Sequence, residues 1–400
     1  MNQKLHQYIL NNWKNTIREN KDVLPKPYTV PCIKEIFVNF FYWDTYFTNL
    51  GLLQAGLVKQ VENNLDNMVY LLDKYGYIPN SDVLLYRSQP PFFTRCVYDL
   101  YKFTNNKEII HKYKSSILKE FKFWKEKRMT PIGLNAHSSD EPKEGLIKNR
   151  YWLSKRIGCN ETEMAVEEEL FGKDLLAIAE SGMDFTIRFK EGENRFAAHE
   201  FAHLDLNCLL YDAEIKASEL FEIIGDKLTS DELKKQAENR HELIDKYMLD
   251  KETGIYYDYN FEKNHLSHIV TGTCLYPYFS GISNNQEAAR TLYKLLMLPY
   301  GLSAGIPREE NNYLQWDYPN MWPSNTYLTY IGFKKIGLDK EAKEIKEKYI
   351  NVLEDNFETT GKLWEKYDAN TGKVSITNEY ETPEMLGWTA GVYEFFLSEK

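Results

Sequence analysis

Helical periodicity runs through almost the whole chain and constrains its fold more than any other feature. Over 46–75, apolar residues recur at steps of three and four positions until Gly76 ends the pattern. A second run, over 206–224, follows Asp205, which we expect to cap that helix. Further helices are predicted near 107–128, 165–180, 231–248, 286–298, 325–337, 340–355 and 384–397.

Evidence for strands is thin, because only 254–259 alternates weakly, as the arm of a short hairpin would. No linker-like stretch divides the 400 residues, so we predict a single domain over 1–400, with 1–40 as an N-terminal leading segment. Helix pairs joined by loops predict an all-α toroid or solenoid. The absence of a sequence repeat favours the closed ring.

Composition limits the function. A formal net charge of −10 argues against a nucleic-acid partner, and no basic run or apolar span indicates a membrane. The five cysteines form no Cys-x-x-Cys pair, and the first residues contain no apolar leader. We therefore predict free thiols and a cytoplasmic location, with no cofactor or metal. The sequence does not indicate an oligomeric state.

Three short segments combine aromatic or arginine side chains with amides and carboxylates. They are Tyr42-Trp43-Asp44, Arg87-Ser88-Gln89-Pro90-Pro91 and Gln315-Trp316-Asp317-Tyr318-Pro319-Asn320. An indole offers a flat platform to the C–H face of a sugar, and charged or amide groups hydrogen-bond its hydroxyls. Two further segments supply Asp184, just after Gly182, and Glu365, beside Trp364. Two carboxylates facing one sugar pocket are the minimum equipment for glycoside hydrolysis, although either could be an ordinary surface charge.

One competing motif points to a different chemistry. His199-Glu200-Phe201-Ala202-His203 matches the H-E-x-x-H pattern of zinc peptidases, and Glu222 is spaced as a third ligand could be. However, the two histidines must share one helix, and the residues just after His203 look like the start of the next helix. The zinc peptidase is therefore a remote alternative, and a non-catalytic carbohydrate-binding protein is a second one.

Taken in order along the chain, these segments resemble the motifs of the trehalase family, inverting α-glycosidases that fold as an (α/α)6 barrel. Arg87-Ser88-Gln89-Pro90-Pro91 is similar to R-S-Q-P-P, and the segment from Gln315 to Pro323 is similar to Q-W-D-x-P-N-G-W-x-P. Further matches are Tyr42-Trp43-Asp44-Thr45-Tyr46, Tyr75-Gly76-Tyr77-Ile78-Pro79-Asn80, Glu180-Ser181-Gly182-Met183-Asp184-Phe185 with Arg188, Asp205-Leu206-Asn207, Glu365-Lys366-Tyr367-Asp368, Glu379-Tyr380 and Gly387-Trp388-Thr389-Ala390-Gly391-Val392.

The resemblance implies a role for each matched position. Asp184 is the expected general acid and Glu365 the expected general base, with their carboxyl groups roughly 6.5–9.5 Å apart to admit the attacking water. The expected substrate-binding residues are Trp43, Asp44, Asn80, Arg87, Ser88, Gln89, Gly182, Arg188, Trp316, Asp317, Glu379 and Trp388. The substrate is expected to be a small carbohydrate, with trehalose as the default.

The chain also departs from the family pattern in the part that would hold the leaving group. The stretch 36–39 occupies the place of the family's P-G-G-R-F, so an expected sugar-binding arginine is missing, and R-P-E-S has no clear match over 133–156. Met183 and Met321 replace Trp and Gly. We therefore expect an altered leaving-group subsite, in which Lys34, Asn39, Arg150 or Lys155 could substitute. The alternative substrates are α-glucosides of the kojibiose, sucrose, glucosylglycerol or glucosylglycerate type.

Overall fold

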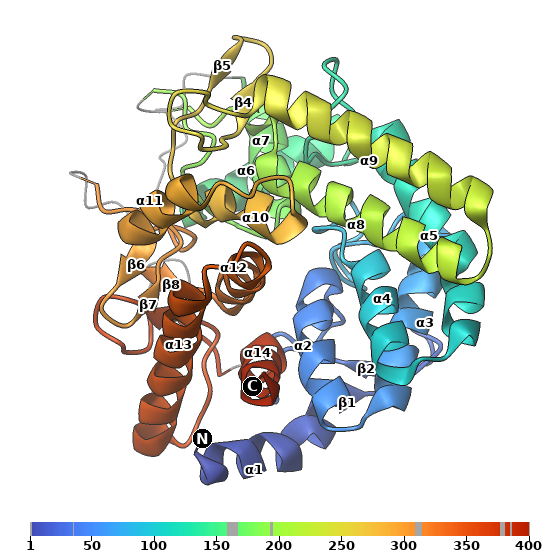
Figure 1. The fold of residues 1–400 in the computed structure, drawn as a ribbon, viewed down its shortest axis with the longest axis vertical. Helices are drawn as coiled ribbons and strands as arrows, with labels where there is room; N and C mark the ends of the chain where they lie inside the picture. Colours follow the sequence, from blue (N-terminus) through green and yellow to red (C-terminus); the bar gives the residue numbers. More distant parts are fainter. Residues whose placement is uncertain are drawn as a thin grey trace.

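The structure, a computed structural model, describes residues 2–34, 36–157, 167–192, 195–308, 314–376, 381–384 and 386–399. Helices dominate it, and Figure 1 shows them arranged around a central axis. Among the described residues, six helices follow one another around this axis, each contacts the next, and the last packs against the first. They are α2 (Tyr42–Gln54), α4 (Phe93–Thr104), α8 (Leu204–Ile223), α10 (Tyr276–Ser280), α12 (Pro323–Lys335) and α14 (Gly387–Ser398). The ring closes, which confirms the all-α toroid.

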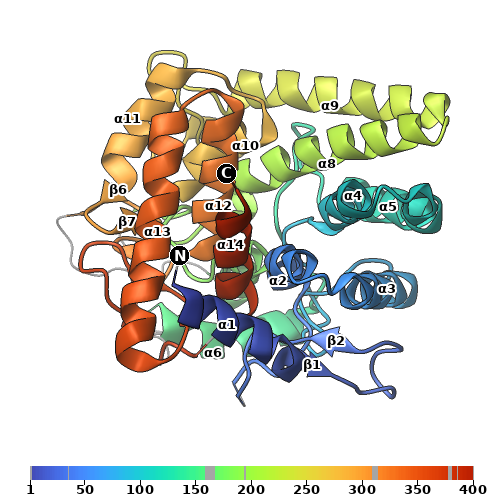
Figure 2. The same ribbon diagram turned by 60° about the horizontal axis from the view of Figure 1, so that its bottom comes forward.

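A second layer of helices packs on the outside of this ring. Its members are α3 (Val58–Tyr75), α5 (Lys107–Lys127), α9 (Lys227–Tyr247), α11 (Gln286–Leu296) and α13 (Asp339–Thr360). α3 contacts α2 and α4, α5 contacts α4 and α8, and α13 contacts α12 and α14. Figure 2 shows α9 lying along α8, and α5 along α4. None of the described helices is both long and apolar enough to span a membrane.

Burial explains which helices lie inside. Every residue of α2 except Gln54 is buried, whereas α13 buries one stripe spaced by three or four residues. A helix that is apolar on all sides belongs in the interior, and an amphipathic helix covers it. The hydrophobic core fills the space between the two layers and includes Leu5 and Ile9 of α1 (Gln3–Asn12).

The predicted helices are present, but two details were wrong. The run over 46–75 is divided into α2 and α3 at Gly56, whose φ of 72° is unfavourable for residues with a side chain. Asp205 does not cap α8, because His203 occupies the cap and Asp205 lies in the first helical turn. Sequence periodicity also missed α1, α4, α6 (Lys143–Arg156) and the five-residue α10.

Short strands join the loops at one end of the ring. β3 (Phe201–Ala202), β4 (Tyr259–Asn260) and β5 (His265–Leu266) form an antiparallel sheet, so only the last residue of the predicted arm over 254–259 is in a strand. β8 (Asn320–Met321) pairs with β9 (Tyr367–Asp368). This second pairing brings the loop before β8 beside Glu365.

Candidate active site

A cavity of about 790 Å³ lies among the loops that lead into the inner helices. Its volume is within the range of small-molecule sites, roughly 300–1,000 Å³. The buried part of its wall consists of Trp43, Asp44, Asn80, Arg87, Gln89, Gly182, Gln315, Trp316, Trp322, Glu365 and Trp388. Helices α2, α12 and α14 begin at or beside these residues. Their first turns therefore hold parts of the wall on the rigid inner ring.

Four tryptophans form an aromatic surface in this cavity. The rings of Trp316 and Trp322 are stacked with centroids 3.9 Å apart, and Trp43 lies 5.7 Å from Trp316 and 5.9 Å from Trp388. Gly182 lets the chain pass directly over Trp43, since a Cβ at this position would lie 2.7 Å from Trp43 Cε2. The aromatic surface can accept the apolar face of a sugar ring.

The polar side chains of the wall offer fixed or unpaired hydrogen-bonding groups to the cavity. The backbone N–H of Trp43 donates to Gln89 Oε1 over 3.1 Å, which fixes the amide of Gln89. Arg87 is only 7% exposed, and its Nε and Nη1 have no hydrogen-bond partner among the described residues. A buried guanidinium without acceptors is expensive unless a ligand supplies them. Arg87 is therefore suited to binding neighbouring hydroxyls.

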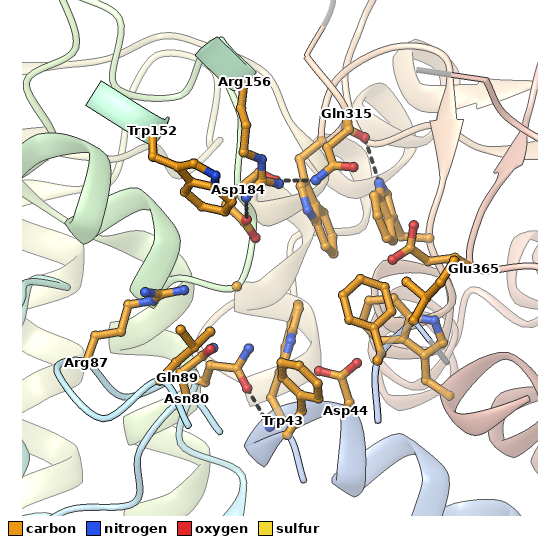
Figure 3. A pocket seen from close by; sticks show the side chains of 18 of the residues that line it. Trp43, Asp44, Asn80, Arg87, Gln89, Trp152, Arg156, Asp184, Gln315 and Glu365 are labelled. Carbon is orange, nitrogen blue, oxygen red and sulfur yellow. Dashed lines mark hydrogen bonds and ion pairs between the residues drawn. The ribbon is translucent and has the colours of Figure 1, made fainter. Parts of the chain in front are cut away.

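The carboxylates Asp184 and Glu365 both line this cavity and come from opposite sides in Figure 3. Arg156 Nη1 donates to Asp184 Oδ2 over 2.5 Å, and the amide of Gln315 donates to the Asp184 carbonyl. Glu365 is 4% exposed, and Lys366 Nζ donates to its Oε2 over 2.7 Å. Each carboxylate is thus held by a neighbouring cation, while both face the same space.

Asp44 is a further carboxylate of the cavity, beside Asp184, Glu365 and Glu381. Burial raises the pKa of Asp44 to about 7, and the nearby charges of Glu365 and Asp184 contribute to the rise. Its carboxyl therefore changes charge near neutral pH. It lies in the first turn of α2, next to Trp43.

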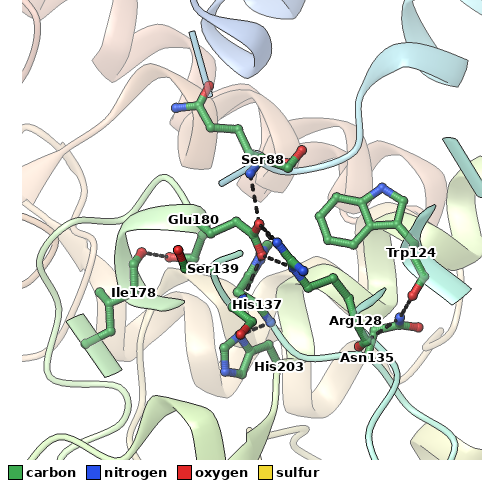
Figure 4. A network of polar contacts seen from close by, with 12 residues as sticks. Ser88, Trp124, Arg128, Asn135, His137, Ser139, Ile178, Glu180 and His203 are labelled. Atoms are coloured by element: carbon green, nitrogen blue, oxygen red, sulfur yellow. Dashed lines mark hydrogen bonds and ion pairs between the residues drawn. The ribbon is translucent and has the colours of Figure 1, made fainter. Parts of the chain in front are cut away.

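A buried polar network holds the loop that carries Arg87 (Figure 4). Glu180, at the end of α7 (Glu168–Glu180), accepts from the backbone N–H of Ser88 over 2.9 Å and from that of Ser138 over 2.7 Å. Arg128 Nη2 donates to the same carboxylate over 2.8 Å. Asp184 follows Glu180 by four residues, so this network connects the segment of Asp184 to the loop of Arg87.

Three of the predicted binding residues do not line the cavity. Ser88 lies behind the wall, where its backbone N–H contacts Glu180 and its Oγ donates to the Ile78 carbonyl. Arg188 is 1% exposed and pairs with Asp205 and Asp258 at 2.7 and 2.6 Å. Neither side chain lines the cavity, and both are held by buried protein partners. Glu379 lies outside the described residues.

Asp317 is the third predicted binding residue that does not line the cavity. It is 2% exposed and accepts from Arg308 Nη2 over 3.0 Å and from the backbone N–H groups of Leu314 and Ile187. Burial raises its pKa to about 6, and Arg308 opposes the rise. Asp317 thus joins the loop of Gln315 to the segment after Asp184. The remaining predicted residues line the cavity, and their binding roles stay predictions.

Several lining residues were not expected from the sequence. Trp152 and Arg156 come from α6, Gln315 and Trp322 from the loop around β8, Ile36 from the loop before α2 and Leu84 from the loop after α3. Gln315 and Trp322 belong to the motif matched over Gln315 to Pro323, so this motif could have predicted that they line the cavity. The sequence carried no such signal for Trp152 and Arg156, because α6 matches none of the quoted motifs.

The zinc motif does not form a metal site. His199 lies in a short 3-10 helix and contacts Asp174, and both ring nitrogens of His203 are engaged, by the Ala198 carbonyl and by the backbone N–H of His137. Burial lowers the pKa of His203 to about 3, so the ring is neutral. Nowhere in the described ranges do three potential ligand side chains gather around one point.

A closed ring of paired helices with carboxylates, tryptophans and hydroxyl-binding groups in one end cavity defines an α/α-barrel glycoside hydrolase. The sequence matches the trehalase family model over residues 2–400. Periplasmic trehalases of Xanthomonas axonopodis pv. citri and Pseudomonas aeruginosa are each 32% identical, over 98% and 92% of this chain and 73% and 70% of their own. The chain belongs to the trehalase family.

Solved structures show the same fold. Neutral trehalase from Saccharomyces cerevisiae superposes with a TM-score of 0.75 at 22% identity, covering 98% of this chain and 79% of that one. Mannosylglycerate hydrolase from Thermus thermophilus gives 0.68 at 17% identity, covering 98% and 100%. Both likenesses support the barrel architecture alone.

The predicted cytoplasmic location is contradicted by the curated relatives, since both are named periplasmic enzymes. The prediction depended in part on the unpaired cysteines. Four of them are buried free thiols in the structure: Cys32, Cys96, Cys208 and Cys274. Thiols that are buried apart from one another cannot form disulfides in any compartment, so they are no indicator of location.

Proposed function

We propose that this enzyme hydrolyses the α-glucosidic bond of trehalose with inversion of configuration. The observation that supports it most is the meeting of Asp184, Glu365 and Arg87 with four tryptophans on one cavity wall. The names of the curated relatives support trehalose as the substrate. The buried part of the cavity would hold the glucose whose anomeric carbon reacts.

In this mechanism Asp184 protonates the glycosidic oxygen as the bond breaks. Glu365 removes a proton from the attacking water on the opposite face, and the product glucose has the inverted configuration. Arg156 contacts Asp184, so substrate entry must weaken this contact before the carboxyl can reach the glycosidic oxygen. Lys366, paired with Glu365, orients the carboxylate of the base.

The test is a glucose-release screen over trehalose, kojibiose, nigerose, maltose, sucrose, glucosylglycerol and glucosylglycerate. We expect trehalose to be cleaved, with α- and β-glucose formed in equal initial amounts by proton NMR, because one glucose is inverted and the other leaves unchanged. Initial release of α-glucose only would indicate retention. Absence of cleavage of every α-glucoside would instead favour a carbohydrate-binding protein.

Asp44 predicts a pH dependence of sugar binding. Its raised pKa means that the carboxyl loses its charge as the pH falls through about 7. Hydrogen bonds to an ionised acceptor are roughly twice as strong as neutral ones. We therefore expect glucose to bind more tightly above this pH than below it, by calorimetry. Asp44→Asn should remove the dependence, and an unchanged dependence in that variant would assign the titration to another group.

A further inference from the structure

Burial divides the cavity into two parts of different chemistry. Its inner wall holds the buried polar side chains and the four tryptophans described above. Among the described residues, the outer wall holds five apolar side chains, Ile36, Phe37, Phe41, Leu84 and Trp152, together with Tyr86, Lys155, Arg156 and Glu381. Ile36 and Trp152 are 55% and 62% exposed, and the other three apolar side chains are half-buried. Large apolar side chains thus continue from the inner wall to the solvent-exposed end of the cavity, where charged groups accompany them.

Asp184 lies at the boundary between these two parts. Its side chain is 25% exposed, whereas that of Glu365 is 5% exposed. A general acid must lie beside the glycosidic oxygen that it protonates. With glucose in the buried part, the leaving group therefore lies beyond Asp184, against the outer wall.

Trp152 is an outer-wall residue that lies beside Asp184 (Figure 3). It stands one helical turn before Arg156 on α6, and the Arg156 guanidinium lies 5.8 Å from its ring centroid. The same guanidinium contacts Asp184. A leaving group protonated by Asp184 would thus contact the exposed indole of Trp152.

The polar side chains expected to bind a second sugar are mostly elsewhere. Lys34 pairs with Glu384, and Arg150 pairs with Glu168. Among the described residues, the cavity wall includes neither of them and also lacks Asn39, while Lys155 lies on it. Ile36 belongs to the stretch that lacks the family's arginine. Hydroxyls of the leaving glucose of trehalose that face the apolar side chains of the outer wall would lose hydrogen bonds to water, whereas an apolar group would gain contacts there.

Exposed apolar side chains are also concentrated at this wall. Of the twelve large apolar side chains exposed in the described part of the chain, Ile36 and Trp152 line the cavity, and Val38 and Val83 lie beside lining residues in the sequence. A gathering of exposed apolar side chains at a concave site usually marks a binding surface.

We propose that the outer wall is a leaving-group subsite for an apolar aglycone, so that the enzyme cleaves alkyl and aryl α-glucosides. The proposal rests on the glucosidase function proposed above. The bond between the anomeric carbon and the aglycone oxygen breaks, and water supplies the new oxygen. Asp184 delivers its proton to the departing alcohol, and Glu365 takes the proton of the water. The aglycone packs on Trp152 and Ile36 during this step.

The experiment compares methyl, propyl and hexyl α-D-glucopyranosides, whose alcohols leave with similar ease. Differences in kcat/KM then report packing of the alkyl chain rather than leaving-group acidity. We expect kcat/KM to rise from methyl to hexyl, by up to about fourfold for each methylene that becomes buried. Equal values for the three, with methyl glucoside or trehalose still cleaved, would overturn the proposal and leave the glucosidase function intact.

Two variants connect the effect to the outer wall. Trp152→Ala should flatten the rise with chain length, and Ile36→Arg should lower hexyl glucoside cleavage while raising that of trehalose. Leu228→Ala, which removes a side chain 83% exposed on α9, is the matched control and should keep the wild-type ratio. A rise that both wall variants retain would contradict this placement. If no α-glucoside is cleaved by any form, the glucosidase function itself fails.

Discussion

Asp184→Asn is expected to lower the turnover of trehalose by about 10²–10⁴-fold, the usual contribution of general acid catalysis. The same variant should hydrolyse α-D-glucosyl fluoride with a much smaller loss. Fluoride leaves without a proton, whereas a sugar alkoxide must be protonated as it departs. Initial rates on the two substrates, measured by glucose release, test the assignment.

Glu365→Gln should behave differently, because every substrate needs an activated water. We expect losses of about 10²–10⁴-fold on trehalose and on the fluoride alike. Asp368→Asn is the matched control: this carboxylate follows Glu365 by three residues, but it caps a turn through the N–H groups of Asn370 and Thr371. It should retain nearly full activity. Equal losses of Asp184→Asn on both substrates would rule out Asp184 as the acid.

The second large effect is on stability. Arg188→Met is expected to lower the free energy of unfolding by about 3–5 kcal/mol, because Asp205 and Asp258 remain buried without their shared cation. Burial alone would raise the pKa of Asp205, but Arg188 and His137 hold it well below its usual range. Denaturant titration followed by circular dichroism measures the loss.

The loss should also depend on pH in a defined direction. A carboxyl whose folded-state pKa is lowered stabilises the fold above its unfolded pKa, and this contribution disappears as the pH falls through the folded value. The difference between wild type and Arg188→Met should therefore shrink toward acid pH. A constant difference would show that Asp205 is not the group left unpaired.

Arg87→Met is the matched control, since Arg87 is also buried but has two donor nitrogens without protein partners among the described residues. Removing it strands no protein carboxylate, so we expect unfolding free energy to stay the same or rise while glucose affinity falls. A large loss of stability in this variant would mean that Arg87 supports the fold. In that case the two buried arginines, both predicted from motifs to bind substrate, would have the same structural role.

The contrast between these arginines shows where reasoning from the sequence ended. Matched motifs identified segments that do come together: Trp43, Arg87, Trp316 and Glu365 lie on one wall although the chain separates them widely. A motif does not say which of its side chains faces the cavity. Ser88, Arg188 and Asp317 belong to the same motifs as lining residues, yet each is turned toward buried protein partners.

By itself, the sequence determined the all-α ring and the segments that build its cavity, because apolar periodicity and short local motifs are properties of neighbouring residues. Only the tertiary structure decided the direction of each side chain and the composition of the outer wall. Trp152, Ile36 and Leu84 come from three separate segments and share no motif. Their meeting on one cavity wall depends on how α6 and two loops pack at one end of the ring, and such long-range packing leaves no pattern in the local sequence.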